Sequence, residues 1–320
     1  MALWQLRLSV LGTLAIIIGL STLFFTVILF WLNVDLLLLP IIVIIINLVQ
    51  WLIAPYLIDA MYRVREVSKS EKPRLHEMVE RLSKKSGLKK PRVMIANIPI
   101  PNAFAYGSPI AGSRVAVTSE LLNTLEEEEV EAVVGHELGH LKHRDVQVMM
   151  FVSILPAIFY YIYISMFLSS MYRGRDNRGS GGALIIGIAS LIMYFILTIF
   201  TLYLSRLREY FADRHSASIV DDGPRKLSEG LAKIVSSTRK MKHARKDVSG
   251  HSSFKALFIS DPDRAEADSA AISRAVGYRS DQRLVEEQLR KDITATDRLV
   301  ELFSTHPNIV KRLRALQRLS

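Results

Sequence analysis

Two histidines and a glutamate stand at a spacing that suits metal chemistry in this 320-residue chain. The stretch reads His136-Glu137-Leu138-Gly139-His140. In an α-helix, residues i and i+4 share one face, so both imidazoles can point at the same place. Imidazoles placed in this way are typical zinc ligands, and a glutamate beside them can take a proton from a water on the metal. We expect His136 and His140 to bind zinc and Glu137 to act as a base rather than as a ligand; ordinary solvent-facing helix residues are the plainer interpretation.

The third zinc ligand must come from elsewhere in the chain. There are no cysteines, so histidine and carboxylate are the remaining choices. Glu209 and Asp213 are four residues apart and share a helical face. We assign Glu209 as the third ligand and Asp213 as the acceptor of the N–H of a ligating histidine. The alternative is an ordinary ion-pair surface with Arg206, Arg208 and Arg214.

The helix that carries the two histidines has a predicted start. Thr124 with Glu127 three residues later reads as a capping box, and acidic residues at 126–129 suit the positive end of the helix dipole. Apolar residues then recur at helical spacing and predict a buried side, at Val130, Val133, Val134, Leu138 and Leu141.

Half of the residues are hydrophobic, and they cluster in runs long enough to cross a bilayer. Basic residues follow the first pair of runs, and none lies in the short connection at 33–35, which predicts a hairpin with both ends in the cytoplasm. Three arginines between the third and fourth runs oppose that rule, so a buried helical pair is the alternative to a second hairpin. The four runs are residues 8–32, 36–58, 146–171 and 183–204.

The remaining sequence predicts a mainly α fold with a small β-sheet. Residues 99–107, rich in proline and glycine, read either as a structural loop or as an edge strand that can hydrogen-bond an extended peptide. Predicted elements are an amphipathic helix at 70–87, strands at 92–96 and 114–118, and helices at 227–234, 292–303 and 310–319. We divide the chain into a transmembrane hairpin (1–60), half of a catalytic domain (61–147), a second hydrophobic hairpin (148–204) and the other half (205–320), with a basic, lid-like insertion at 240–280.

These motifs, in this order, resemble the HtpX-type membrane metalloproteases, a family related to the CaaX prenyl endopeptidases. The matching pieces are the two amino-terminal runs, Asn102-Ala103-Phe104, the stretch from His136 to His140, the stretch from Glu209 to Asp213, and Thr305-His306-Pro307 followed by Arg312. The resemblance implies a thermolysin-like zinc-protease domain with one Zn²⁺ per subunit. It implies that Asn102, Ala103 and Phe104 bind substrate at a sheet edge, that His306 stabilises the oxyanion, and that Arg312 supports the site with Asp213 as its candidate partner.

The resemblance also implies a quality-control and stress-response endopeptidase in the plasma membrane, with a cytoplasmic catalytic domain. Its substrates would be misfolded or damaged membrane proteins or unfolded polypeptides. The lipid bilayer would be a further partner. The formal charge of +10 then reflects membrane-flanking residues, and nucleic acid is not expected as a partner. A prenyl-protein processing protease and a catalytically inactive membrane scaffold are the alternatives. Because His140 and Glu209 lie close to apolar runs, we expect the zinc within about 10 Å of the membrane surface, and cleavage near the membrane.

Overall fold

The computed structural model describes residues 38–172, 180–244 and 281–319. The apolar run at 8–32 and residues 245–280 of the predicted insertion lie outside them. The chain divides into two compact units. One comprises Met1–Trp51 with Gln147–Leu204, and the other comprises Leu52–Val146 with Ser205–Ser320.

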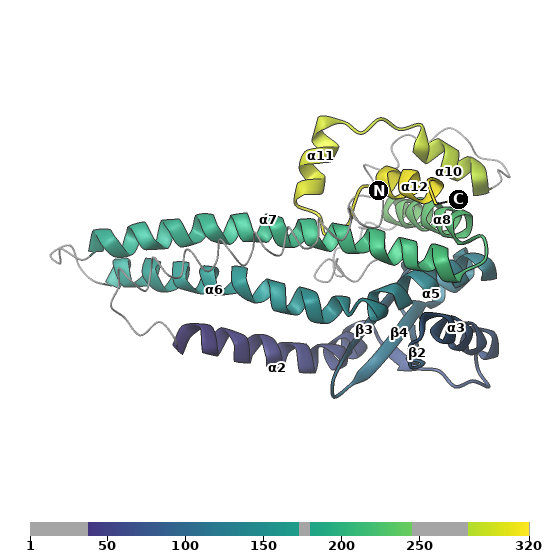
Figure 1. The fold of residues 1–320 in the computed structure, drawn as a ribbon, viewed down its shortest axis with the longest axis horizontal. Helices are drawn as coiled ribbons and strands as arrows, with labels where there is room; N and C mark the ends of the chain where they lie inside the picture. Colours follow the sequence, from purple (N-terminus) through teal and green to yellow (C-terminus); the bar gives the residue numbers. More distant parts are fainter. Residues whose placement is uncertain (1–37, 173–179, 245–280, 320) are drawn as a thin grey trace. The chain divides into compact units, whose positions relative to one another are not determined.

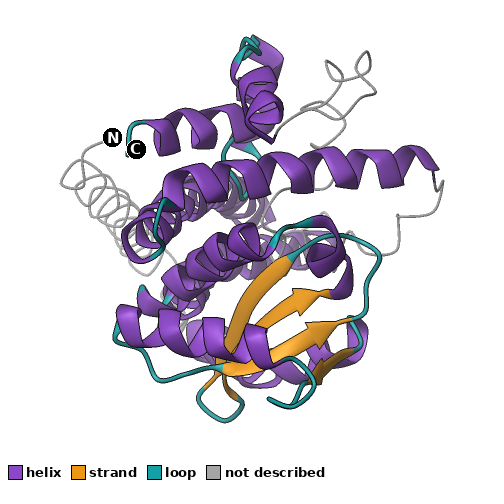
Figure 2. Cartoon of the chain, turned by 90° about the vertical axis from the view of Figure 1, so that its right-hand side faces the viewer, coloured by secondary structure: helices purple, strands orange, loops and turns teal. Residues whose placement is uncertain are grey.

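A small mixed sheet lies in the second unit (Figure 2). Its strands are β1 (Val64–Glu66), β2 (Arg92–Ala96), β3 (Ala103–Ser108) and β4 (Gly112–Thr118), in the spatial order β1-β2-β4-β3. The central pair, β2 and β4, is parallel, whereas β1 and β3 are antiparallel to their neighbours. The predicted strands at 92–96 and 114–118 are confirmed, and the ambiguous segment 99–107 contains an edge strand, β3.

The two faces of the sheet are covered by different helices, because side chains alternate between faces along each strand. On one face, Ala103, Ala105 and Val115 belong to a core with α3 (Pro73–Ser86) and α5 (Glu127–Lys142). On the other face, Phe104 and Tyr106 pack against the end of α2 (Leu38–Met61). The predicted amphipathic helix at 70–87 is α3, and it ends at Gly87 in the left-handed conformation (φ 65°).

The predicted capping box of α5 is wrong by two residues. Thr124 is the last residue of a separate short helix, α4 (Ser119–Thr124), and its hydroxyl donates a hydrogen bond to the carbonyl of Glu120. The N-cap of α5 is Glu126, which forms the capping box with Glu129. Thr118 caps the short helix, whose last residue is the threonine that the sequence pattern assigned to the start of α5.

Two long helices, α6 (Asp145–Tyr172) and α7 (Ser180–Ile219), contain the third and fourth apolar runs (Figure 1). By length and composition, residues 145–167 and 182–219 could each cross a membrane. The two helices share a buried cluster that includes Phe159, Ile162 and Leu197. As predicted, α7 continues without a break into the segment with Glu209 and Asp213.

The rest of the described chain is helical: α8 (Gly223–Ala244), α10 (Asp281–Leu289), α11 (Ala295–Leu302) and α12 (Ile309–Gln317). The helix predicted at 227–234 is part of the longer α8, and α10 was not predicted. Leu227 and Leu231 of α8 join Leu313 and Leu316 of α12 in the core that also buries α5. This core holds the helix with the two histidines against the carboxy-terminal helices.

Candidate metal centre

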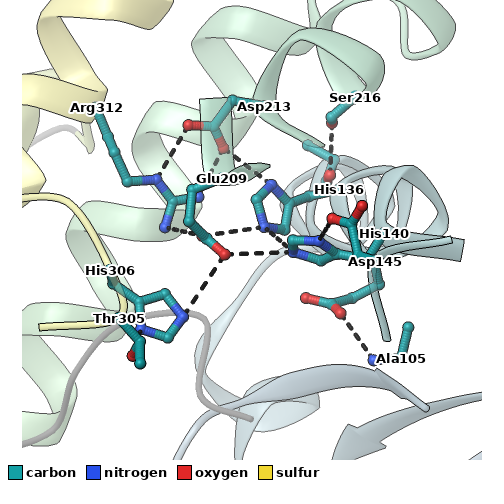
Figure 3. A network of polar contacts seen from close by, with 12 residues as sticks. Ala105, His136, His140, Asp145, Glu209, Asp213, Ser216, Thr305, His306 and Arg312 are labelled. Atoms are coloured by element: carbon teal, nitrogen blue, oxygen red, sulfur yellow. Dashed lines mark hydrogen bonds and ion pairs between the residues drawn. The ribbon is translucent and has the colours of Figure 1, made fainter. Parts of the chain in front are cut away.

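Three side chains from two helices converge in the second unit (Figure 3). His136 and His140 project from the same side of α5, with their Nε2 atoms 3.2 Å apart. Glu209 of α7 reaches both rings: its Oε2 is 3.6 Å from Nε2 of His136, and its Oε1 is 3.5 Å from Nε2 of His140. The structure thus brings together the three residues that the sequence assigned as zinc ligands.

The separations of these atoms fit a shared metal ion. Ligand atoms about 2.0–2.2 Å from a tetrahedral zinc lie about 3.3–3.5 Å from one another. The three measured separations, 3.2, 3.5 and 3.6 Å, are close to that range. Two imidazoles and one carboxylate are also a donor set that catalytic zinc uses. The residues therefore fit zinc on both distance and chemistry.

Glu137 is close to the histidines but is anchored differently. Its carboxylate lies within 4.8 Å of the ligand atoms of His136 and His140, so it also could face a metal ion. However, its Oε2 accepts a hydrogen bond from the backbone N–H of Ala105 in the edge strand β3, at 2.8 Å. Burial raises the pKa of Glu137 above its ordinary value, against the opposing effect of the two histidines. Glu209 faces both Nε2 atoms at 3.5–3.6 Å, whereas one oxygen of Glu137 is held by the edge strand, so the surroundings of the two carboxylates differ.

Asp213 lies one helical turn after Glu209 and faces the far nitrogen of His136. Its Oδ1 is 2.9 Å from Nδ1 of His136, and Arg312 donates to the same carboxylate through Nε and Nη2, at 3.0 and 2.6 Å. Nη1 of Arg312 is also 3.1 Å from Oε2 of Glu209. Burial lowers the pKa of His136, but the carboxylates of Asp213 and Glu209 outweigh this and raise it to about 9. The same negative charge would stabilise a bound cation.

Asp145 and Arg208 belong to the site, and the sequence analysis missed them. Oδ2 of Asp145, the first residue of α6, is 2.6 Å from Nδ1 of His140. Arg208 of α7 forms an ion pair with the other oxygen of Asp145, and both side chains are buried. Each histidine of the pair therefore has its own carboxylate partner. A signal was available, since ligating histidines usually give their second N–H to a carboxylate or carbonyl.

His306 lies in the segment between α11 and α12, far from the other site residues in sequence. Its Nε2 is 3.7 Å from Oε1 of Glu209, and its Nδ1 is 3.0 Å from the hydroxyl of Thr305. The side chain is buried. The structure thus places a third imidazole beside the carboxylate, with one nitrogen directed at the site.

The three residues expected to bind substrate, Asn102, Ala103 and Phe104, are all buried. Burial argues against a direct contact between their side chains and a substrate. Thr118 donates its backbone N–H to the carbonyl of Asn102, at 2.9 Å. Because outward and inward peptide groups alternate along an antiparallel strand, Phe104 also pairs with β4, whereas Ala103 and Ala105 face the free edge. The hydrogen bond from Ala105 to Glu137 agrees with that alternation. The backbone groups of Ala103 and Ala105 therefore lie at the edge of the described sheet, on the side away from β4.

Comparisons with known proteins identify relatives over most of the chain. Residues 69–320 match the family described as peptidase family M48. The chain is 41% identical over 276 residues to a protease HtpX homolog of Aeropyrum pernix, covering 85% of this chain and 83% of that protein. It is 35% identical over 287 residues to a protease HtpX homolog of Thermoplasma acidophilum, covering 88% and 84%.

The crystal structure of S. mikatae Ste24p is similar to this fold, with a TM-score of 0.54 and 14% identity. The likeness covers 97% of this chain and 65% of that one, so the chain spans about two thirds of its length. At this identity the likeness concerns the fold alone.

Proposed function

The chain belongs to peptidase family M48, and from this premise we propose that it is a membrane-bound, zinc-dependent endopeptidase. The observation that carries the proposal is the convergence of His136, His140 and Glu209 to within 3.6 Å of one another, with the Glu137 carboxylate beside them. The zinc, the hydrolytic mechanism and the substrates are proposals that rest on this geometry and on the family.

His136, His140 and Glu209 would hold one zinc ion. Bound zinc lowers the pKa of water and polarises a carbonyl oxygen, which is the chemistry that peptide hydrolysis needs. Asp213 and Asp145 would accept the second N–H of the two imidazoles and fix each ring with its Nε2 toward the site.

Glu137 would be the general base. Its carboxylate takes a proton from the attacking water and later delivers that proton to the leaving amine. Two features support this role: the Ala105 N–H holds one oxygen in place, and burial raises the pKa of Glu137, so the carboxylate takes a proton more readily. His306 would donate a hydrogen bond to the oxyanion that forms on the substrate carbonyl.

The free edge of β3 would bind the substrate as an added strand. The outward peptide groups of Ala103 and the carbonyl of Ala105 would bind a backbone in extended form, next to Glu137, which accepts the N–H of Ala105. We propose that this arrangement is thermolysin-like. It combines an edge strand that binds substrate, a neighbouring helix with two histidines, and a glutamate ligand on a later helix.

We propose that the substrates are misfolded or damaged membrane proteins or unfolded polypeptides, and that the catalytic part lies in the cytoplasm. Backbone recognition, which reads few side chains, suits substrates of varied sequence. Glu209 follows Leu204, the end of an apolar run, by five residues on one unbroken helix, which is about 8 Å of helix rise. This supports cleavage in cytoplasmic loops and near-membrane segments rather than within the bilayer.

The two alternatives have less support. The Ste24p likeness is one of fold at 14% identity, so it does not select prenylated substrates. An inactive scaffold would have no need for the four side chains that peptide hydrolysis uses, and His136, Glu137, His140 and Glu209 are all present.

Removal and return of the metal test the proposed function. Purified full-length protein in detergent should cleave unfolded casein, lose that activity with a zinc chelator, and regain it with one equivalent of zinc. Activity that survives complete removal of zinc would refute a zinc peptidase. Mapping of cuts on a membrane-protein substrate then tests location, because cuts confined to the middle of transmembrane helices would contradict near-membrane cleavage.

A further inference from the structure

Arg206 makes an unusual set of contacts one turn before Glu209 on α7. Its side chain is buried, and its Nη1 donates to three backbone carbonyls. The acceptors are the carbonyls of Glu301 at 2.8 Å, Leu302 at 3.3 Å and Ser304 at 2.7 Å. These residues are the end of α11 and the start of the segment that carries His306.

The end of a helix is a suitable place for an arginine. The last carbonyls of a helix have no helical donor, and a cation is favoured at the negative end of the helix dipole. A guanidinium that reaches three of these carbonyls also fixes the direction in which the chain leaves the helix.

The segment that follows is tied to the same residues. The N–H of His306 donates to Oγ of Ser304 at 3.2 Å, and the N–H of Asn308 donates to the carboxylate of Glu301 at 3.1 Å. The backbone on each side of the imidazole is therefore bonded to a residue whose carbonyl Arg206 holds.

We propose that Arg206 is a positioning residue for His306, an inference that rests on the proposed function. Arg206 and Glu209 stand on one rigid helix, and Nε2 of His306 is 3.7 Å from Oε1 of Glu209. Through Arg206, the helix that supplies the third zinc ligand also sets the location of the imidazole. A displacement of about 1 Å at a reacting group can cost about 10²-fold in rate.

A purely structural role for Arg206 predicts a different outcome. If Arg206 only capped α11, its loss would lower stability and leave the rate of the folded enzyme unchanged. If it acts through His306, its loss lowers kcat, and that loss disappears once His306 has been removed.

A double-mutant cycle separates these cases. Arg206→Ala, His306→Ala and the double variant are compared in the full-length, zinc-loaded protein on a peptide substrate. We expect each single variant to lower kcat by about 10–10²-fold with KM unchanged within about twofold, and the double variant to match His306→Ala. Multiplication of the two losses in the double variant would overturn the proposal, as would an unchanged kcat in Arg206→Ala.

Binding gives a second readout that does not depend on turnover. A zinc-directed phosphinic peptide, whose tetrahedral oxygens mimic the oxyanion, should lose affinity by the same factor in Arg206→Ala as in His306→Ala. Zinc content should remain one per chain in both. Loss of zinc in Arg206→Ala would show that the arginine acts through Glu209 instead, and would overturn the proposal.

Two further variants control for folding. Arg225→Ala removes a different arginine, one that contacts Asp222, Glu229 and Glu128, and it should leave kcat unchanged. Should Arg206→Ala not fold, Arg206→Lys serves instead, because one ammonium can donate to some of the carbonyls. The kcat of Arg206→Lys alone should lie between those of the wild type and Arg206→Ala. The kcat of Arg206→Lys combined with His306→Ala should equal that of His306→Ala, and any other pattern overturns the proposal.

The proposal and the proposed function fail in different ways. A wild-type protein without chelator-sensitive proteolysis refutes the function. An active wild type in which the Arg206 and His306 losses are independent refutes only the positioning role.

Discussion

Two buried glutamates lie beside the same pair of histidines, and their neighbours suit them to the different roles that we propose. Glu209 faces Nε2 of both His136 and His140, and Arg312 is 3.1 Å from one of its oxygens, which favours a charged, fixed ligand. Glu137 has a backbone N–H of the edge strand as its partner. A carboxylate with a raised pKa next to the substrate edge is suited to carry protons.

Replacement of Glu137 by glutamine should separate catalysis from metal binding. The amide oxygen of the new side chain could still accept the Ala105 N–H, so the fold and the zinc site stay intact, while the base is lost. We expect proteolysis in Glu137→Gln to fall by about 10²–10⁴-fold with zinc content unchanged. Rates measured together with zinc per chain check this, and undiminished proteolysis would exclude Glu137 as the base.

Removal of Glu209 should release the metal. Loss of a residue that hydrogen-bonds to a metal ligand lowers metal affinity by about 10–100-fold. We expect zinc affinity to fall by more than this in Glu209→Ala, because a ligand itself is lost. Glu229→Ala is a suitable control, since Glu229 is a buried glutamate paired with Arg225 and should leave zinc binding unchanged. Full zinc occupancy in Glu209→Ala at limiting zinc would mean that another residue is the third ligand.

The site residues differ in how far the sequence could predict them. His136, Glu137 and His140 were predictable because one helical turn fixes their geometry locally. Glu209 was predictable only from the chemical requirement for a third ligand. Asp145 was missed although a signal existed, since it follows His140 by five residues and its carboxylate contacts that ring. Arg206 was not predictable, because its contacts are with a segment distant in sequence, which no local pattern records.

At the scale of elements, the site depends on the close approach of α5 to α7. A Cβ at Gly139 would lie 2.9 Å from Cα of Ala212 and 3.1 Å from Cβ of His215. A Cβ at Gly135, one turn earlier, would lie 3.1 Å from Oγ of Ser216 on α7 and 3.0 Å from Cγ2 of Val220, just beyond the end of α7. Glycine next to the histidines therefore allows the helix of Glu209 to come within ligand distance.

Gly139→Ala should push these helices apart. Overpacking costs about 1–3 kcal/mol, which exceeds the about 1 kcal/mol that alanine gains in helix propensity. We expect a lower thermal unfolding midpoint and weaker zinc binding than in the wild type. Gly182→Ala is the matched control, because a Cβ there meets no atom within 4 Å. Equal behaviour of the two variants would contradict the packing argument.

Elements with clear periodicity were predicted well, and their boundaries less so. The strand at 114–118 follows from the alternation of its valines, and the helix α3 follows from an apolar stripe with a glycine at its end. The start of α5 was misplaced, since Thr124 and Glu127 satisfy the capping pattern although Thr124 ends another helix. The segment 99–107 stayed ambiguous, because pairing with β4 decides whether it is a strand.

At the scale of the whole molecule, one helix links the candidate metal site to an apolar run. The helix α7 contains both the fourth apolar run and the segment with Glu209, without a break between them. The predicted orientation of the apolar runs in the membrane rests on the positions of basic residues. The arginines at 173, 175 and 178 oppose the prediction that the connection between the third and fourth runs lies outside.

Single cysteines can determine the topology, because the natural chain has none. We expect Asn33→Cys to react with a membrane-impermeant maleimide in intact cells, and Glu126→Cys to react only after permeabilisation. Arg175→Cys distinguishes the alternatives for the second pair of runs: external labelling supports a spanning hairpin, and labelling only after permeabilisation supports a helical pair that does not cross. Labelling of Glu126→Cys from outside would contradict a cytoplasmic site.

The most direct test of the central claim is X-ray absorption at the zinc edge, with metal analysis of the same purified full-length protein. We predict one zinc per chain, with two imidazole nitrogens and a carboxylate oxygen at about 2.0–2.2 Å. The imidazole signal should be unchanged in His306→Ala. Less than stoichiometric zinc after reconstitution, or the loss of one imidazole from the zinc in His306→Ala, would contradict a site made by His136, His140 and Glu209.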